Sequence, residues 1–389
     1  MNAPSLITPR ARVAVFAHDL SGTGVARNAR ALAAALAAEY EVELIACRGG
    51  AMAQGVGHFT LTTLGAPERM GPADVAQAVL RLRARLVEAR PAVAISAGNR
   101  GHAMLVAATA GLTAPRRIYR MSNDLAHGRK GAARSGLAKF ANDLQTAAVV
   151  GDVTRLVLVS EHLLEDSRLA RVAALGKAVV IENGVDVDGI RARALEQCDH
   201  PFTAPGAPPF VVAVGRMVAQ KNFGLLVEAV ALANRTTPLN LLILGGGGPG
   251  AMAALQARAA LLGIGDRLAL PGYVANPFAY IARARVFALP SWWEGASNVL
   301  LEALAVGTPV VGSTSAGNAA AVLDGGTYGV LADPDDPAAW ATALLSQAGP
   351  DAVTPGDRVD DYRLSDTLAA WTALVGAELV AGAPISRSR

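Results

Sequence analysis

The chain has 389 residues, of which 52% are hydrophobic and 17% charged, and its formal net charge is +3. This composition excludes a largely disordered protein and provides enough apolar residues for two or three domains of about 100–200 residues each. Aromatic residues make up only 5% of the chain, which disfavours an all-β sandwich and suits buried strands that alternate with helices. The two cysteines, Cys47 and Cys198, are too few for a disulfide framework or a four-ligand zinc site.

Signals for export or membrane insertion are not evident in the sequence. Residues 1–10 contain no apolar segment followed by a small-residue cleavage site, and the chain has no long uninterrupted apolar run. We therefore expect a cytoplasmic protein that does not span a membrane.

Buried strands and helices alternate through the first half of the chain. The run Arg12–His18 (RVAVFAH) is typical of a buried strand, and the Ala-rich segment Val25–Glu39 is typical of a helix. The other strands expected in this half are Glu41–Cys47, Ala92–Ala97, Arg117–Met121, Leu156–Ser160 and Lys177–Glu182. The other helices expected are Val75–Ala89, His102–Ala110 and one near Ser135–Val149. Continuous apolar strands separated by helices predict a parallel sheet covered on both faces.

A proline-rich segment, Cys198–Pro209 (CDHPFTAPGAPP), indicates a domain boundary, after which the alternation restarts. The strands expected beyond it are Phe210–Val214, Leu239–Leu244, Arg267–Leu270, Val286–Pro290 and Pro309–Gly312. The helices include Phe223–Asn234, Ala251–Leu262 and Ser365–Val380. We predict an α/β protein with two doubly wound, Rossmann-like domains, residues 1–200 and 201–364, whose cleft is the expected ligand site. Residues 365–389 are expected to form a helix that can pack back on the first domain, followed by a tail.

Basic residues cluster in the first half of the chain. Arg81, Arg83, Arg85 and Arg90 fall on one expected helix. They are followed by Arg116, Arg117, Arg120, Arg129, Lys130, Arg134 and Lys139. Two interpretations stay open, namely ordinary solvated helix faces or a surface that meets anionic lipid headgroups or a phosphate-bearing acceptor.

A glycine-containing loop, Ser21–Arg27 (SGTGVAR), follows the first strand. Gly22 and Gly24 allow close approach of the backbone to a ligand, and the next helix offers free N–H groups to an anion. A plain strand-to-helix turn explains the same residues. The dinucleotide fingerprint requires a third glycine where Arg27 stands and an acidic residue at the end of the second strand. Both are missing, which disfavours a nicotinamide-dependent oxidoreductase.

Two cations follow the first strand of the second half. Gly215-Arg216 comes directly after the strand, and Lys221-Asn222 opens the next helix. The guanidinium can fork across phosphate oxygens while the ammonium acts as a point charge, so the pair can converge on a diphosphate. Surface charge alone explains the pair equally well.

The segment Ser291–Pro309 combines an acidic loop with the start of a helix. Glu294 and Gly295 lie in the loop, and Ser297 or Asn298 suits the N-cap of the helix that carries Glu302. The N–H groups from Ser297 to Val299 form an expected anion cradle. Glu302 stands among leucines and therefore needs a partner if it is buried.

These motifs together resemble the retaining family-4 glycosyltransferases of the GT-B fold, in the expected order over nearly the whole chain. The resemblance rests on E-x7-E (Glu294 to Glu302), G-R (Gly215-Arg216), K-N (Lys221-Asn222), N-G-V-D (Asn183–Asp186) and L-E-A-L-A-x-G-x-P-V-V. It implies that Arg216 and Lys221 hold the diphosphate, that Glu294 contacts the transferred sugar and that Glu302 binds the ribose hydroxyls. The loop of Gly22 and Gly24 would approach the donor, and Tyr273 and Val274 would lie near the nucleobase.

The resemblance also implies a reaction and its substrates. It favours a UDP-sugar donor, with an N-acetylhexosamine as the candidate sugar, and a glycan or lipid-linked acceptor in envelope polysaccharide synthesis. Transfer would retain the anomeric configuration. A lipid-linked acceptor would bring the protein to the inner face of the cell membrane, and nothing indicates a nucleic-acid partner.

The chain departs from the family pattern at three places. It lacks the acidic residue of G-G-x-E-R at Thr23–Arg27, has Ser122-Asn123-Asp124 in place of a His-Asp pair, and has Ala319-Ala320-Ala321 in place of Pro-Arg-Glu. His102 is the remaining imidazole near the second departure. We treat it as a candidate acceptor-side base or sugar ligand, with an ordinary surface histidine as the alternative.

No metal and no cofactor are expected. The D-x-D sequences Asp186-Val-Asp188 and Asp333-Pro-Asp335 both resemble turns or helix caps. Two cations and a helix N-terminus are available to neutralise a leaving diphosphate. The rival functions are nucleotide-sugar epimerisation or phosphorolysis on the same fold, and a non-catalytic nucleotide-sugar binding protein.

Overall fold

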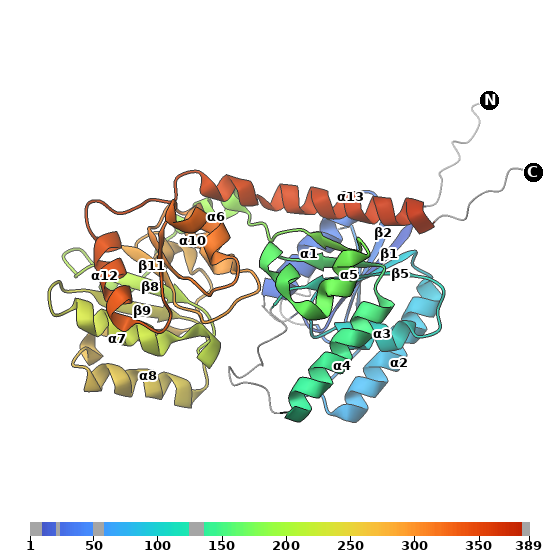
Figure 1. Ribbon diagram of the computed structural model, residues 1–389, viewed down its shortest axis with the longest axis horizontal. Coiled ribbons are helices and arrows are strands. Elements are labelled where there is room, and N and C mark those ends of the chain that lie inside the picture. The colour runs from blue at the N-terminus through green and yellow to red at the C-terminus, as the bar shows by residue number, and fades with distance from the viewer. Residues whose placement is uncertain (1–9, 21–23, 50–57, 124–135, 383–389) are drawn as a thin grey trace, which may run out of the picture. The chain divides into compact units, whose positions relative to one another are not determined.

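The computed structural model describes residues 10–20, 24–49, 58–123 and 136–382, which form two compact units (Figure 1). The first unit contains the described parts of Met1–Ser122, Gly136–Ile181 and Thr367–Arg389, and the second contains Glu182–Asp366 together with Asn123. The boundary therefore falls at Ile181, before the proline-rich segment and not at residue 200. The reason is that helix α6 (Val187–Ala194), expected in the first domain, buries Val187 and Ile190 in the core of the second unit.

The first unit is built on a seven-stranded parallel sheet in the order β3-β2-β1-β4-β5-β6-β7. Its strands are β1 (Arg12–Ala17), β2 (Glu41–Ala46), β3 (Thr60–Thr63), β4 (Val93–Ser96), β5 (Arg116–Met121), β6 (Arg155–Leu158) and β7 (Ala178–Val180). Its helices are α1 (Gly24–Leu36), α2 (Pro72–Ala89), α3 (His102–Thr109), α4 (Gly136–Asp152), α5 (Ala170–Ala174) and most of α13 (Leu364–Gly382).

The second unit repeats this plan with a six-stranded parallel sheet in the order β10-β9-β8-β11-β12-β13. Its strands are β8 (Phe210–Val214), β9 (Asn240–Leu244), β10 (Leu268–Gly272), β11 (Val286–Leu289), β12 (Val310–Ser313) and β13 (Val330–Ala332). The helices besides α6 are α7 (Phe223–Ala233), α8 (Pro249–Leu261), α9 (Phe278–Ile281), α10 (Asn298–Ala305), α11 (Ala319–Val322) and α12 (Pro337–Ala348). Both sheets thus have the doubly wound order that was predicted.

Alternating side chains of the second sheet enter two separate cores. On β8, Val211 and Ala213 pack with α7 and α12, whereas Phe210 and Val212 pack with α6, α9 and α10. Successive residues of a strand point to opposite faces, so a strand buried on both faces reads as one continuous apolar run. This explains why the strands of this unit could be located from their composition.

The edge strands β3 and β13 were not predicted. Strand β3 has the sequence TLTT, and all four of its residues are partly or fully exposed. Strand β13 is only three residues long. Neither offers the apolar run that identifies a buried strand.

The arginines that suggested a basic surface are largely bonded inside the first unit. Arg83 donates to the carbonyl oxygens of Ala108 and Ala110 at 3.0 and 2.7 Å, and Arg85 binds Glu43 at 2.6 Å. Arg81 and Arg117 likewise bind carbonyl oxygens, and Arg120 is buried. These side chains join elements of the fold, so the proposed basic surface does not hold for them. Residues 129, 130 and 134 lie outside the described residues.

Helix α13 is attached to the first unit by a buried carboxylate. Glu378 is fully buried and binds Arg116 of β5 at 2.6 Å and Arg155 of β6 at 2.8 Å. Trp371 and Val375 join the core beneath β1 and β4. Among the described residues, α13 is long and apolar enough to cross a membrane by length and composition alone. Residues 383–389, the expected tail, lie outside the described residues.

Candidate functional site

Most of the predicted donor residues follow the two strands at which the second sheet reverses its order. The segment after β8 carries Gly215, Arg216 and Lys221, and the segment after β11 carries Glu294 and Ser297. In doubly wound sheets, ligands bind outside the carboxyl ends of the strands at this reversal. The topology therefore places these residues where a ligand site is expected.

Lys221 and Glu294 form an ion pair, with Nζ 2.6 Å from Oε1. Both side chains are largely buried, at 14% and 11% exposure. Such a pair is electrostatically strong, because little water surrounds it. The two residues chosen from separate sequence motifs are thus in direct contact.

Glycines allow the backbone segments at this edge to approach each other closely. A Cβ on Gly215 would lie 2.9 Å from Cε of Lys221, so the lysine side chain passes directly over this glycine. A Cβ on Gly317, whose φ is +57°, would lie 2.3 Å from the carbonyl oxygen of Glu294. Gly215 therefore has a structural reason to be glycine, besides the ligand contact that was predicted for it.

The start of α10 differs in detail from the expected anion cradle. Ser297 is the N-cap residue, but its hydroxyl makes no cap hydrogen bond and its amide donates to Oδ1 of Asn318 at 3.3 Å. The amide of Ser297 is therefore engaged, which corrects that part of the prediction. The amides of Asn298 and Val299 have no hydrogen bond to the described residues, so these two remain available to an anion.

The remaining predicted residues of this motif sit around that helix start. Gly295 is buried in the loop, and Glu302 is buried one turn into α10 at 3% exposure and is not left without a partner. Asn298 also accepts a hydrogen bond at Oδ1 from Nδ2 of Asn183 at 2.8 Å. The motif N-G-V-D thus reaches the start of α10 through its asparagine.

Arg216 is exposed, and its guanidinium makes no hydrogen bond or ion pair with the described residues. Tyr273 and Val274 follow β10, an edge strand separated from β8 by β9. Tyr273 is 77% exposed, whereas Val274 is partly buried. Arg216 and Tyr273 therefore present free side chains at the same edge of the sheet, two strands apart.

His102 lies in the first unit at the start of α3 and is buried, so the alternative of a surface histidine is wrong. Its Nδ1 is 2.7 Å from Oγ of Ser96, and its ring meets the ring of Tyr119 edge-on at 5.3 Å. Burial, helped by the charge of Arg120, lowers the pKa of His102 to about 3. A base this weak is a poor proton acceptor at neutral pH, which favours a neutral sugar ligand over an acceptor-side base. Gly24 begins α1 and is exposed, and Gly22 lies outside the described residues.

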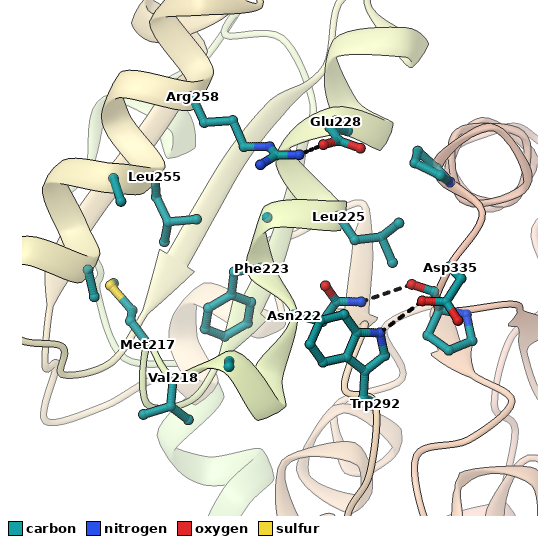
Figure 2. Close-up of a pocket in the computed structure, with 16 residues that line it drawn as sticks. Met217, Val218, Asn222, Phe223, Leu225, Glu228, Leu255, Arg258, Trp292 and Asp335 are labelled. Atoms are coloured by element: carbon teal, nitrogen blue, oxygen red, sulfur yellow. Dashed lines mark hydrogen bonds and ion pairs between the residues drawn. The ribbon is translucent and has the colours of Figure 1, made fainter. Parts of the chain in front are cut away.

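A mostly apolar groove of about 520 Å³ lies beside the start of α7 (Figure 2). Met217, Phe223 and Leu255 line it from the segment after β8, α7 and α8. Trp292 forms one wall and donates from Nε1 to Asp335 at 3.3 Å. Trp292 therefore belongs both to this groove and to the loop that carries Glu294.

The D-x-D sequences act as turns and caps, as predicted. Asp186 accepts a hydrogen bond from the amide of Gly189 at 3.0 Å at the start of α6, and Asp333 accepts one from the amide of Asp335 at 2.9 Å. In the described part of the chain, no three His, Cys, Asp or Glu side chains gather into a group that could hold a metal ion.

Gln220 and Asn318 belong to this site but were not predicted from the sequence. Gln220 binds the main chain of Trp292 and Trp293, and Asn318 binds the amide of Ser297. Neither lies in a recognisable pattern. Gln220 precedes Lys221 directly, and this adjacency is the only sequence signal that could have identified it.

Two family models match the chain. The Glycosyltransferase Family 4 model matches residues 22–188, and the Glycosyl transferases group 1 model matches residues 208–348. The matches follow each other along the chain, one over most of the first unit and the other over most of the second.

Characterised relatives align over parts of the chain. The N-acetylgalactosamine-N,N'-diacetylbacillosaminyl-diphospho-undecaprenol 4-alpha-N-acetylgalactosaminyltransferase of Campylobacter jejuni is 32% identical over 160 residues, 41% of each chain. The GDP-mannose-dependent alpha-(1-6)-phosphatidylinositol monomannoside mannosyltransferase of Mycolicibacterium smegmatis is 33% identical over 230 residues, 54% of this chain and 55% of the relative. The chain thus spans about half the length of these relatives.

A solved structure shows the same fold over nearly the whole chain. The structure of HepE from Anabaena in complex with UDP-glucose superposes with a TM-score of 0.77 at 14% identity, covering 94% of this chain and 99% of that one. The two Rossmann-like units are thus those of the GT-B fold. With both family models in chain order on those units, the chain belongs to the glycosyl transferases group 1 of the GT-B fold.

Proposed function

We propose that the protein transfers a sugar from a nucleotide-diphosphate donor to a glycan or lipid-linked acceptor. The observation that carries this proposal is the contact between Lys221 and Glu294 at the carboxyl ends of β8 and β11. The same edge of the sheet carries the exposed Arg216, and the loop after β11 leads to the two available amides of α10. Cations and amides suit a diphosphate, and a buried carboxylate suits a sugar hydroxyl.

The chemical step needs stabilisation of a leaving diphosphate. The bond between the anomeric carbon and the phosphate oxygen breaks while the acceptor oxygen bonds to that carbon. The acceptor proton passes to the leaving phosphate. Arg216, Lys221 and the amides of Asn298 and Val299 would stabilise the negative charge that develops. The family resemblance favours retention of the anomeric configuration, which NMR analysis of the product tests directly.

Transfer is proposed to need no metal ion. Positive charge is already supplied by two side chains and a helix start, and the described D-x-D aspartates act as caps or turn formers. Full activity in the presence of EDTA is the expected result. Loss of activity that Mg²⁺ or Mn²⁺ restores would contradict the proposal.

The favoured donor is a UDP-sugar, with an N-acetylhexosamine as the candidate sugar. One structural neighbour was solved with UDP-glucose and one relative is named as an N-acetylgalactosaminyltransferase, whereas another is named as GDP-mannose-dependent. A thermal-shift panel of UDP, GDP, ADP and NAD, on wild type and Glu302→Ala, distinguishes these donors. A ligand at about 100 times its dissociation constant stabilises a protein by about 2.7 kcal/mol. Stabilisation of wild type by UDP alone, lost in the variant, is expected.

The alternative functions predict different products. An epimerase or a phosphorylase consumes the donor without a sugar acceptor, and a non-catalytic binding protein is stabilised by the donor but releases no nucleotide. Acceptor-dependent release of the nucleoside diphosphate is the expected result. Release that is independent of the acceptor, or no release at all, would refute glycosyl transfer.

We further propose a cytoplasmic location and peripheral contact with the inner face of the membrane. Two relatives are named for lipid-linked acceptors, and α2 and α4 expose Leu80, Phe140 and Leu144. Since most of the described arginines of this unit are bonded internally, contact through apolar side chains is favoured over contact through charge. Sedimentation with phosphatidylcholine vesicles, with and without phosphatidylglycerol, tests this. Binding should change little between about 0.1 and 0.5 M salt.

A further inference from the structure

We infer that Gln220 is a positioning residue that keeps Lys221 and Glu294 at a fixed spacing while a donor is bound. The inference rests on the proposed function, because it assigns separate targets on the donor to these two side chains. Gln220 binds the tryptophan pair before Glu294 at two points. Its main-chain oxygen accepts from the amide of Trp292 at 3.0 Å, and its Nε2 donates to the carbonyl oxygen of Trp293 at 2.8 Å.

These contacts join the two site loops residue by residue. Gln220 meets Trp292 and Trp293, and the next residue, Lys221, meets Glu294, 73 residues further along the chain. Two side-chain contacts are described between the segment 219–221 and the loop 292–294. One is the ion pair, and the other is the hydrogen bond from Nε2 of Gln220. This amide therefore adds a side-chain tie between the two loops to the main-chain hydrogen bond from Trp292 to Gln220.

Each loop is also fixed on its outer side. Oγ of Ser315 donates to the carbonyl oxygen of Trp292 at 2.7 Å, and the indole of Trp292 donates to Asp335. Nδ2 of Asn222 donates to the carbonyl oxygen of Pro334 at 2.9 Å. Trp292 and Asn222 thus stay attached to the unit independently of Gln220. Loss of the glutamine amide should alter the spacing between the loops without detaching either of them.

Donor binding makes this spacing important. The ammonium of Lys221 is attracted to the diphosphate, whereas the carboxylate of Glu294 accepts hydrogen bonds from sugar hydroxyls. Both interactions with the donor weaken the ion pair that joins the loops in the ligand-free state. The neutral amide of Gln220 is bound to main-chain groups that the donor does not replace, so it holds the loops in register when the ion pair is weakened. Misplacement by about 1 Å at a reacting centre can lower a rate about 100-fold.

Another glutamine of the second unit, which is fully buried, provides a control. Gln347, in the last turn of α12, donates from Nε2 to the carbonyl oxygens of Val310 and Val353 and accepts from the amide of Val353 at 2.8 Å. It stabilises the fold with more hydrogen bonds than Gln220 makes, and it contacts neither site loop. A methionine substitution keeps the length of either side chain and removes its hydrogen bonds.

The experiment compares Gln220→Met with Gln347→Met, using UDP and UDP-N-acetylglucosamine, or GDP and GDP-mannose if guanine nucleotides stabilise the wild type. We expect Gln220→Met to lower kcat by about tenfold to 100-fold and to lose most of the added affinity of the nucleotide-sugar over the nucleoside diphosphate. Its affinity for the diphosphate alone should change less than about threefold, since Lys221, Arg216 and the α10 amides all remain and the diphosphate does not need Glu294 at a fixed distance from Lys221. Gln347→Met should lower Tm. It should leave kcat unchanged, and also the ratio of the affinities for nucleotide-sugar and nucleoside diphosphate.

The outcomes separate this inference from the proposed function. Wild-type kcat in Gln220→Met, or equal loss of kcat and of diphosphate affinity, overturns the positioning role. If the wild type transfers no sugar to any acceptor, the proposed function fails. The ratio of nucleotide-sugar to nucleotide affinity then still tests Gln220, because that ratio needs no turnover.

Discussion

The buried imidazole of His102 makes stability in acid a quantitative test of the first unit. Its pKa is lowered from 6.5 to about 3, chiefly by burial, so the folded state keeps it neutral over a range in which the unfolded chain is protonated. A group with a lowered folded pKa contributes stability above its unfolded pKa, and this contribution is lost as the pH falls. His102 should therefore destabilise the protein progressively below about pH 6.5.

The magnitude follows from the two pKa values. At pH 5 the unfolded histidine is almost fully protonated and the folded one almost fully neutral. Integrating the difference in bound protons from pH 7 to pH 5 gives a loss of about 2 kcal/mol. For a unit of this size, that loss corresponds to a decrease in Tm of about 4–8 °C.

His102→Asn is the appropriate perturbation, because asparagine keeps a polar atom near Oγ of Ser96 and does not titrate in this range. The variant loses some stability at every pH, so only the change between pH 7 and pH 5 is compared. Carboxylates contribute equally to both proteins and cancel. Urea unfolding at the two pH values should show about 2 kcal/mol less acid destabilisation in the variant than in wild type. Equal losses in both proteins would refute the assignment of a buried, neutral His102.

Three further perturbations test the site and its support. Arg216→Ala should lower kcat/KM by about 10²–10³-fold, equivalent to roughly 3–4 kcal/mol. Tm should not change, because this exposed side chain is bonded to none of the described residues. Full activity would remove Arg216 from the proposed diphosphate site. Lys221→Met should destabilise the second unit by about 3–5 kcal/mol in thermal unfolding, because Glu294 is left buried without its cation. The double variant Lys221→Met/Glu294→Leu should recover part of this loss. Additive losses of stability would contradict the pairing. Glu378→Gln should release α13 from two arginines and increase its proteolytic cleavage under native conditions, whereas unchanged cleavage would show that Trp371 and Val375 suffice.

The sequence was sufficient to predict elements that can be recognised from their own residues alone. Strand β8 was predicted with its observed bounds, Phe210–Val214, because a strand buried on both faces is apolar at every position. Lys221 and Glu294 were both selected from motifs that follow such strands, and topology brought them together. Strand position and the doubly wound order were therefore enough to place these two predicted residues at one edge of the sheet.

Features that depend on pairs of residues far apart in the chain could not be predicted. The amide of Ser297 looked available because nothing in the local sequence shows that Asn318 reaches it. His102 looked exposed because helix starts usually are, yet this one is buried against Ser96 at the end of β4 and Tyr119 of β5. The bridging role of Gln220 depends on the distance between two loops, and no residue pattern along one loop encodes that distance.

The internal arginines have a consequence for anyone who alters the charge of this protein. An arginine such as Arg117, which donates from Nε to the carbonyl oxygen of Asp152 at 3.2 Å and from Nη1 to that of Pro115 at 3.1 Å, uses the fork shape of its head group as well as its charge. Lysine has a single ammonium on a flexible stem and cannot match two fixed acceptors in the same way. Exchanging such arginines for lysine conserves the net charge at neutral pH but removes hydrogen bonds between helices and strands. Two variants with the same net charge can therefore differ in the rigidity of the first unit.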